Sequence, residues 1–261
     1  MSFFDWSFFT DAILHPSDQW MTGLWRTIYI SVLAQVGGVV LGLFVALARR
    51  SRFAIPRMLA AGYVWIVRGT PLLVQLVIVY NGLAATGLYR FQDMTLGSLT
   101  LLGVVQAAIL TLAINETAYM AEIIRAALDA IDVGQTEAAK ALGMTPAVAM
   151  RTVLLPQATK MVIPPLGNEF NLMMKSTSLL SVIGVQEMFL TAQSINSATF
   201  KTFEIFAAAA VYYLLLTTVW GFIQAAIERK LGEPDVTIDQ VGLRDRVFGR
   251  GSRVRLTEGA R

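Results

Sequence analysis

The sequence predicts an all-α fold: a polytopic membrane protein with five transmembrane helices, its N-terminus outside and its C-terminus in the cytoplasm. Hydrophobic residues fill 55% of the 261 positions and charged residues only 15%, whereas a soluble domain carries about 25% charged residues. The apolar residues form five long runs, and a helix needs ~20 such residues to cross a bilayer. Basic residues gather between alternate runs, which predicts the orientation.

Residues 1–21 are predicted to form a periplasmic or interfacial segment. Aromatic residues are mixed there with Asp5, Asp11 and Asp18, and this mixture suits a short helix at the non-cytoplasmic face of a membrane. A frayed terminus is the alternative. Because the segment has no basic stretch and acidic residues interrupt it, we expect no cleavable signal peptide.

The first predicted span covers residues 24–48. Gly38 and Gly42 stand four positions apart in it, and such a small-xxx-small pair lets another helix approach closely. We expect this contact within the chain, with a contact to another subunit as the alternative.

The second predicted span, residues 58–83, is broken in its middle by the Gly-Thr-Pro stretch at 69–71. The proline removes a backbone donor and the glycine permits close approach. One hypothesis is that the freed backbone groups, beside Arg68, Thr70 and Gln75, bind the charged ends of a zwitterion. A kink sealed by Thr70 is the alternative.

Three further spans are predicted at residues 98–124, 161–190 and 203–227, followed by a basic cytoplasmic tail at 231–261. Arg and Lys concentrate in the segments that the positive-inside tendency assigns to the cytoplasm, with four in residues 49–57, four in 125–160 and eight in 229–261. An odd number of spans argues against the paired inverted repeats of many secondary transporters.

The fourth span is unusually polar, because Asn168, Glu169, Asn171 and Ser176 fall inside a segment that must cross lipid. A charge at the bilayer centre costs about 2.5–3.5 kcal/mol or more, so these side chains must face protein or water. The Pro-Pro-Leu-Gly stretch at 164–167 is expected to break the regular helix. Glu169 and Ser176 are two helical turns apart and therefore share a face.

These polar residues predict a substrate path near the middle of the membrane. Its candidates are Arg68, Thr70 and Gln75 in the second span, Asn115 and Glu116 in the third, and Asn168, Glu169, Asn171 and Ser176 in the fourth. The alternative is a set of interhelical hydrogen bonds that only hold the bundle together. We favour function for Glu169. For the Asn115–Glu116 pair, and for the run of serine and threonine residues at 176–178 and 181, we favour the structural alternative.

No pattern in the sequence predicts catalysis. The chain has no cysteine and a single histidine, His15, and it lacks a Gly-Lys-Ser/Thr phosphate loop and any metal-ligand spacing. We expect no enzyme activity, no metal site and no cofactor in this chain. The basic residues are explained by cytoplasmic segments, so we expect no nucleic-acid partner.

Residues 134–156 form a polar, broken helical stretch between apolar spans. Thr136 is expected to cap a short helix over 137–142, which Gly143 ends. Thr145-Pro146 then restarts a helix as N-cap and first helical residue. The stretch is too polar to be a span, and it predicts a rigid helical knob in the cytoplasm.

The spacing of Glu137-Ala138-Ala139, Gly143, Val153 and Leu155-Pro156 resembles the EAA loop of bacterial ABC importer permeases, with Val153 where that family usually has isoleucine. The neighbouring motifs are similar to those of the polar amino acid uptake permeases. They are RGTPLLVQL (68–76), AYMAEIIRAAL (118–128) and LPQATKMVIPPLGNEFNLMMKSTSLLSVIGVQE (155–187). The resemblance covers most of residues 25–225.

The resemblance implies a permease subunit of an ATP-driven importer for polar amino acids in the bacterial inner membrane, with residues 22–230 as its transmembrane domain. Two ATP-binding subunits would hold the ATP and Mg²⁺ and would drive alternating access. A second permease copy or homologue and an external substrate-binding protein would complete the complex. The residues that would contact the ATP-binding subunits are Glu137, Ala138, Ala139, Leu142 and Gly143.

The same resemblance makes Glu169 suited to a cationic group of the substrate. One departure matters: the family commonly has Lys-Asp where this chain has Lys175-Ser176, which argues against a strongly cationic substrate and leaves glutamine, glutamate or cystine-like solutes. Three alternatives stay open: a stand-alone secondary transporter or channel, a non-binding partner in a heterodimeric permease, and a membrane scaffold.

Overall fold

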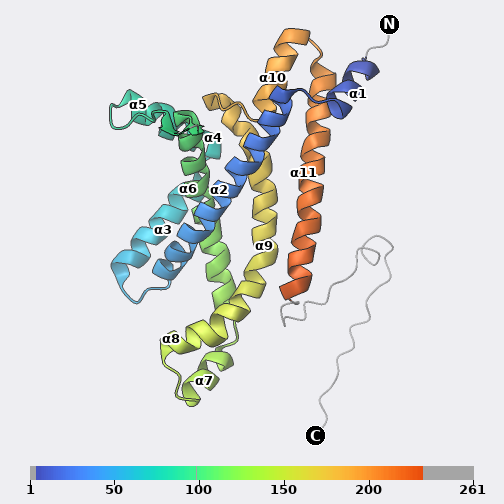
Figure 1. The fold of residues 1–261 in the computed structure, drawn as a ribbon. Coiled ribbons are helices and arrows are strands. Elements are labelled where there is room, and N and C mark those ends of the chain that lie inside the picture. Colours follow the sequence, from blue (N-terminus) through green and yellow to red (C-terminus); the bar gives the residue numbers. More distant parts are fainter. Residues whose placement is uncertain (1–3, 98, 232–261) are drawn as a thin grey trace.

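The protein is a bundle of long helices with a small β-hairpin (Figure 1). The computed structural model describes residues 4–97 and 99–231, so the predicted basic tail lies outside the described residues beyond Leu231. In chain order the elements are α1 (Trp6–Leu14), α2 (Asp18–Arg49), α3 (Ala54–Gly69), α4 (Leu72–Val77), η1 (Ile78–Gly82), α5 (Leu83–Ala85), β1 (Met94–Leu96), β2 (Leu99–Leu101), α6 (Gly103–Asp129), α7 (Val133–Ala141), α8 (Pro146–Ala149), η2 (Met150–Leu154), α9 (Leu155–Ser176), η3 (Thr177–Ile183), α10 (Met188–Thr199) and α11 (Thr202–Leu231).

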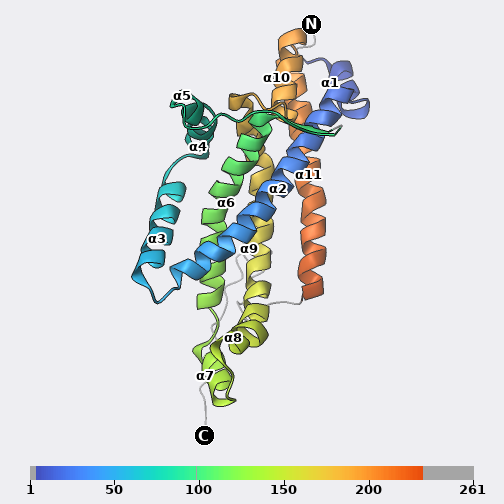
Figure 2. The ribbon, with the colours of Figure 1, turned by 60° about the vertical axis from the view of Figure 1, so that its left-hand side comes forward.

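The two ends of the bundle differ. α1 and α10 lie at one end and the short helices α7 and α8 protrude at the other (Figures 1 and 2); we call these the α10 end and the α7 end. The predicted outer segment and the predicted cytoplasmic loop therefore lie at opposite ends of the molecule, as the proposed orientation requires.

The helical class is confirmed, and within residues 4–97 and 99–231 three helices are long and apolar enough to cross a membrane: α2, α6 and α11. The pair formed by α3 and the segment from α4 to α5 is bent by 105° and makes a fourth if it is one span. α9 is not among them, because polar residues interrupt its apolar surface. The count of five spans and the N-out orientation stay predictions.

The contact of α2 with α6 forms the centre of the bundle, and two glycines make it close. A Cβ atom on Gly38 would lie 2.5 Å from Glu116 Cγ, and one on Gly42 would lie 2.7 Å from Met120 Cβ. Real Cβ atoms do not approach so closely, so these positions require glycine. The expected contact within the chain is confirmed for this pair.

Replacing Gly42 by alanine is expected to destabilise the protein by about 1–3 kcal/mol, because the added methyl group must push α2 away from α6. Gly62→Ala in α3 is the matched control, since nothing lies within 4 Å of its added Cβ. Thermal unfolding in detergent micelles measures both changes. Equal stability of the two variants would contradict the close packing.

The second predicted span consists of two helices rather than one kinked helix. α3 ends at Gly69, and α4 begins at Leu72 in a different direction (Figure 2). Pro71 lies between them, and the residue before a proline is driven out of the helical region; Thr70 accordingly has φ −120° and ψ 143°. α3 stands apart from α9, α10 and α11 in both ribbon views.

α9 continues without interruption through Pro164 and Pro165, so the predicted break of this helix is wrong. The two adjacent prolines remove donors from a single turn, and α11 packs against it. Trp220 Nε1 donates to the Gly167 carbonyl at 2.8 Å, and Gln224 Nε2 donates to the Pro164 carbonyl at 3.3 Å. These bonds join the turn that follows the prolines to α11.

The boundaries of the third and fourth spans also need correction. β1 and β2 pair as an antiparallel hairpin with Gly97 at its turn (φ 63°), so α6 begins at Gly103 and not at residue 98. After α9 the chain passes through the 3₁₀ segment η3 and reverses at Gly184 (φ 88°). α10 then occupies most of the predicted loop 191–202. Both reversals use the left-handed region that glycine adopts readily.

A buried carboxylate fixes the start of α10. Glu187 accepts hydrogen bonds from the N–H groups of Phe189 and Leu190, both at 2.8 Å, and from the Tyr213 hydroxyl at 3.2 Å. An N-cap acceptor of this kind satisfies N–H groups that have no partner inside the helix. The side chain also joins α10 to α11.

α1 is a packed helix rather than a frayed terminus. Lys201 Nζ donates to Asp5 Oδ2 at 2.9 Å, and the Asp5 N–H donates to Glu204 Oε1 at 2.8 Å. The Lys201 ammonium group holds the pKa of Asp5 well below its usual range. These contacts bind the start of α1 to the start of α11, while its place at a membrane surface stays a prediction.

Candidate functional site

A buried polar pair joins the middles of α2 and α6. Gln35 and Glu116 are 5% and 4% exposed, and Gln35 Nε2 donates to Glu116 Oε1 at 2.8 Å. Glu116 therefore lies between two helices and not on an open path, which agrees with the structural alternative. Sequence reasoning missed Gln35, although a glutamine in the middle of an apolar span was the available signal.

Gln75 seals the break between α3 and α4. Its Nε2 donates to the Val67 carbonyl at 2.8 Å and to the Thr70 hydroxyl at 2.8 Å, and its Oε1 accepts from Asn115 Nδ2 of α6 at 3.0 Å. The Thr70 hydroxyl itself donates to the Ile66 carbonyl. The Ile66 and Val67 carbonyl groups near the end of α3 are thus occupied, and Thr70 together with Gln75 bridges the break between the two helices.

Two of the candidates, Arg68 and Glu169, carry opposite charges. Glu169 is half-buried on α9, and Arg68 is exposed at the end of α3. The Arg68 guanidinium lies over the Tyr119 ring of α6, 5.2 Å from the ring centroid. The two charges are close enough to interact electrostatically, and no direct ion pair joins them among the described residues.

The remaining candidates lie along α9 and differ in exposure. Asn168 is exposed, Ser176 is half-buried, and the Oδ1 atom of Asn171 is buried without a hydrogen-bond partner among the described residues. Thr177 and Ser178 donate to backbone carbonyls three residues earlier. Both hydroxyl groups thus donate within their own segment of the chain, and the structural interpretation of the Ser/Thr run stays a prediction.

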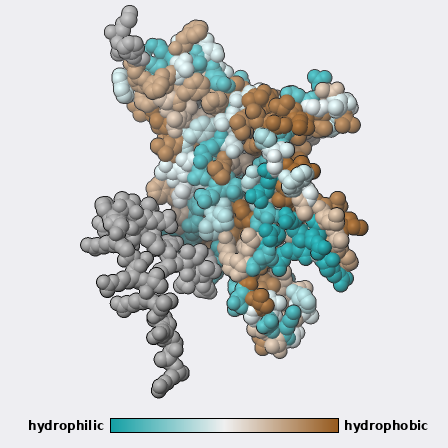
Figure 3. Space-filling view, turned by 180° about the vertical axis from the view of Figure 1, so that it is seen from behind, coloured by the Kyte–Doolittle hydropathy of each residue, from teal (hydrophilic) through white to brown (hydrophobic). Residues whose placement is uncertain are grey.

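Hydrophilic surface extends across the middle of the molecule and down the side of α3 when it is seen from behind (Figure 3). Arg68, Gly69 and Thr70 are exposed. The polar candidates therefore do not form one enclosed cavity within this chain. Thr70, Gln75 and Asn115 have structural partners, while Arg68, Asn168 and Glu169 retain access to the surface.

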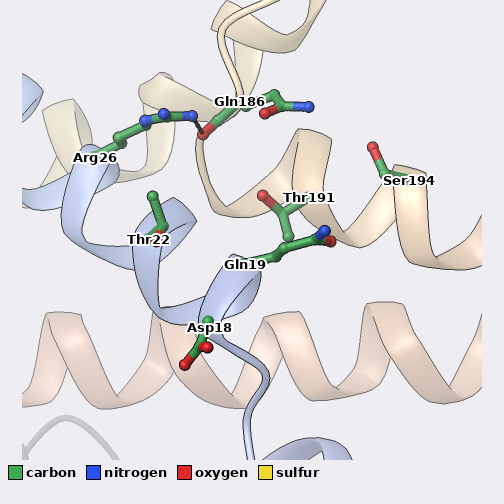
Figure 4. Close-up of a pocket in the computed structure, with 7 residues that line it drawn as sticks. All are labelled: Asp18, Gln19, Thr22, Arg26, Gln186, Thr191 and Ser194. Atoms are coloured by element: carbon green, nitrogen blue, oxygen red, sulfur yellow. Dashed lines mark hydrogen bonds between the residues drawn. The ribbon is translucent and has the colours of Figure 1, made fainter. Parts of the chain in front are cut away.

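A separate pocket of about 400 Å³ lies at the α10 end, between the start of α2 and α10 (Figure 4). Arg26 Nη1 donates to the Gln186 carbonyl at 3.0 Å and holds the rim together. None of the predicted substrate residues lines this pocket. Its lining is Asp18, Gln19, Thr22, Arg26, Gln186, Thr191 and Ser194.

The polar knob at the α7 end is a capped helix with a defined turn. Asp132 caps α7, because its Oδ1 accepts from the Gly134 N–H, so the prediction of Thr136 as the cap is wrong. Asp132 is the cap because the helix begins directly after it, one turn earlier than predicted. The predicted end at Gly143 is confirmed: its φ is 73°, and its N–H bonds to the Lys140 carbonyl.

The turn after Gly143 has the form of a Schellman motif, since the Met144 N–H also reaches the Ala139 carbonyl at 3.0 Å. The predicted restart is confirmed as well: Thr145 is the N-cap of α8 and Pro146 its first residue. α7, the tight turn and α8 thus form a rigid unit at this end, which we call the α7 unit.

Most of the predicted coupling residues face outward. Glu137, Ala138, Leu142 and Gly143 are exposed, and Leu142 is 76% exposed, while Ala139 is buried at 3%. Val133 on the same helix is 71% exposed, and sequence reasoning missed it. The protruding unit therefore presents apolar and acidic side chains away from the bundle.

Comparison with known proteins identifies the family of this chain. The family model described as "Binding-protein-dependent transport system inner membrane component" matches residues 38–233. The glutamine transport system permease protein GlnP of Escherichia coli (strain K12) is 38% identical over 228 residues, which are 87% of this chain and 98% of the relative. The arginine transport system permease protein ArtQ of Bacillus subtilis (strain 168) is 37% identical over 215 residues, 82% and 93% of the two chains.

A solved structure agrees with both relatives. The crystal structure of an amino acid ABC transporter with histidines is 40% identical, covers 81% of this chain and 94% of its own, and superposes with a TM-score of 0.72. The match to the family model begins inside α2 and includes α3 to α11, and thus α7. This chain belongs to the family of binding-protein-dependent transport system inner membrane components, the multi-pass permease subunits of ABC importers.

Proposed function

We propose that this chain is the permease subunit of an importer for polar amino acids, and that two ATP-binding subunits drive its alternating access by displacing α7. A second permease copy or homologue and an external substrate-binding protein complete the complex. ATP and Mg²⁺ belong to the ATP-binding subunits. The proposal extends the family assignment to a substrate class and to a defined set of partners.

The observation that carries the coupling role is the exposure of α7 and its C-cap. Val133 and Leu142 are large apolar residues that are more than two thirds exposed, and they protrude from the bundle at the two ends of a helix that is capped at both ends. Nine positions separate them, so they lie on opposite sides of the helix, and exposed apolar side chains on such a projection favour a protein groove that encloses it. Glu137 adds a charge at the centre of the same helix.

The pair formed by Arg68 and Glu169 supports an amino acid as the substrate. A zwitterion presents one carboxylate and one ammonium group, and we assign these to the guanidinium of Arg68 and the carboxylate of Glu169. The names of the relatives, a glutamine and an arginine permease, agree with this class. Ser176 in place of a second carboxylate on the Glu169 face favours an uncharged polar side chain.

The exposure of Arg68 supports a second subunit beside α3. A guanidinium at membrane depth is costly against lipid, so we expect a second permease copy or homologue to cover the surface formed by Arg68, Thr70 and Asn168. The substrate path then lies between two subunits.

At the α10 end, the pocket beside Asp18 and Arg26 is our candidate contact for the external binding protein.

Reconstitution in liposomes tests the proposal. The chain, its ATP-binding subunits and its binding protein are expected to take up a radiolabelled amino acid only with ATP inside, and the binding protein with its amino acid is expected to stimulate ATP hydrolysis. Glutamine, glutamate, cystine and arginine are compared in parallel. Ion-driven uptake by the chain alone would instead indicate a stand-alone transporter.

A further inference from the structure

A cluster of charged side chains joins α2 to α6 at the α7 end of the bundle. Arg49 Nη1 lies 2.5 Å from Glu122 Oε1, Arg125 Nη2 lies 2.9 Å from Glu122 Oε2, and Arg125 Nη1 lies 2.8 Å from Asp129 Oδ2. Arg50 bonds to the other oxygen of Asp129. We call these five residues the ion-pair cluster. Glu122 and Arg125 lie in the AYMAEIIRAAL motif of residues 118–128, and Asp129 follows it directly. The charged residues of this motif have no role in the site described above.

Glu122 is the centre of the cluster. Each of its carboxylate oxygens pairs with a different arginine, one from α2 and one from its own helix. The Glu122 side chain is 19% exposed and that of Arg49 is 23% exposed, whereas Asp129 is 47% exposed. An exposed ion pair contributes little, so the connection between the two helices depends mainly on the partly buried Arg49–Glu122 pair.

The cluster lies immediately before the helix that the ATP-binding subunits are proposed to move. α6 ends at Asp129 and α7 begins at Val133. Ile131 in this short link is 8% exposed and belongs to the same apolar cluster as Ala127 and Leu128 of α6. Because the link is short and packed, a displacement of α7 is transmitted to the end of α6.

α2 connects this end with the middle of the bundle. It contacts α6 at Gly42 and Gly38, and its Gln35 bonds to Glu116. The glycine contacts rely on shape alone, and helix contacts of this kind can slide unless polar bonds fix their register. The ion-pair cluster supplies such a bond where the force from α7 arrives.

We infer that Glu122 is a positioning residue that clamps α2 to α6 at the α7 end, so that the two helices move as one unit when α7 is displaced. The inference rests on the proposed coupling function, and it adds a residue outside the EAA loop to the path of force. The clamp stays closed throughout the transport cycle.

The first test measures amino acid uptake per ATP hydrolysed by the reconstituted complex. Glu122→Gln and Arg49→Gln are each expected to lower this ratio about tenfold, a typical coupling effect between two sites. The double variant is expected to be no worse than either single variant, because both remove the same bond. Arg57→Gln is the matched control: Arg57 forms none of the ion pairs found within residues 4–97 and 99–231, and its removal should leave the ratio unchanged.

The second test replaces the ion pair by a covalent bond. The chain contains no cysteine, so Arg49→Cys and Glu122→Cys introduce the only two thiols of this subunit, which a short bifunctional maleimide can join. The double variant is expected to be uncoupled before cross-linking and to regain most of its uptake per ATP afterwards. Loss of the remaining uptake on cross-linking would overturn the inference, because it would mean that α2 and α6 must separate at this end.

The rate of cross-linking separates a failure of the clamp from a failure of the proposed function. It is measured on the same complex without nucleotide and with ATP trapped, and it needs no transported substrate. Because this double variant lacks the ion pair, different rates in the two states support the inference, even if the complex imports a different solute: they show that α2 and α6 separate at this end once the ion pair is removed. Equal rates contradict the inference, even if amino acid uptake is confirmed, because the two helices then stay together without the ion pair.

Discussion

Gly143→Val is expected to reduce ATP-driven amino acid uptake about 10- to 100-fold, the range of coupling between distant sites in proteins. Gly143 has φ 73°, a conformation that costs L-residues roughly 1–2 kcal/mol and β-branched residues more. Valine there should open the Schellman turn and displace Leu142, so that α7 no longer fits its partner. ATP hydrolysis by the ATP-binding subunits should then proceed without uptake.

The matched control is Gly87→Val. Gly87 has φ 70°, and nothing lies within 4 Å of an added Cβ at either glycine, so the local strain is the same in both variants. Gly87 follows α5, in a part of the chain outside the α7 unit (Figure 1). Uptake should therefore survive in Gly87→Val. If Gly143→Val transports as well as Gly87→Val, α7 does not transmit the force.

Glu169→Gln is expected to raise the KM of amino acid uptake about 30-fold, with a smaller change in kcat. We assign Glu169 to the ammonium group of the substrate. Removing one partner of a charge pair that binding buries costs about 2 kcal/mol or more, and 1.4 kcal/mol corresponds to a factor of ten in affinity. Glutamine keeps the size of the side chain and removes only its charge. The measurement is the concentration dependence of uptake in liposomes, with the binding protein held at saturating concentration.

Ser178→Ala serves as the control for this change. Its hydroxyl donates to the Lys175 carbonyl of its own helix, so we expect the KM to be unchanged. The thermal stability of both variants is measured in parallel. An unchanged KM in Glu169→Gln together with lower stability would assign Glu169 to the packing of the bundle and not to the substrate.

The features that the sequence predicted well have local causes. Helices commonly end at a residue with a positive φ, and glycine adopts this conformation most readily. Gly143 therefore marks the end of α7 without knowledge of the fold. Thr145 and Pro146 act on the backbone within one turn and mark the start of α8. The EAA spacing and the apolar runs are also contiguous in the chain, and they suffice for the helical class and for the family.

Two predictions of local structure are wrong because each depends on information from outside its own pattern. Thr136 and Asp132 are both good N-caps, and the choice between them depends on where α6 stops, at Asp129. The break predicted at Pro164 and Pro165 is absent from α9, and the turn packs against Trp220 and Gln224 of α11, 53 to 60 residues away. A sequence pattern over ten residues does not contain this information.

The sequence by itself therefore determined the class, the family and the helical knob at the α7 end, together with a set of polar candidate residues. Only the tertiary structure decided which polar side chains are partners. Gln35 meets Glu116 across 81 residues, Gln75 meets Asn115 across 40, and Arg49 meets Glu122 across 73. The physical reason is that propensities and caps act within a few residues, whereas a buried polar side chain acquires its function from the partner that helix packing brings to it.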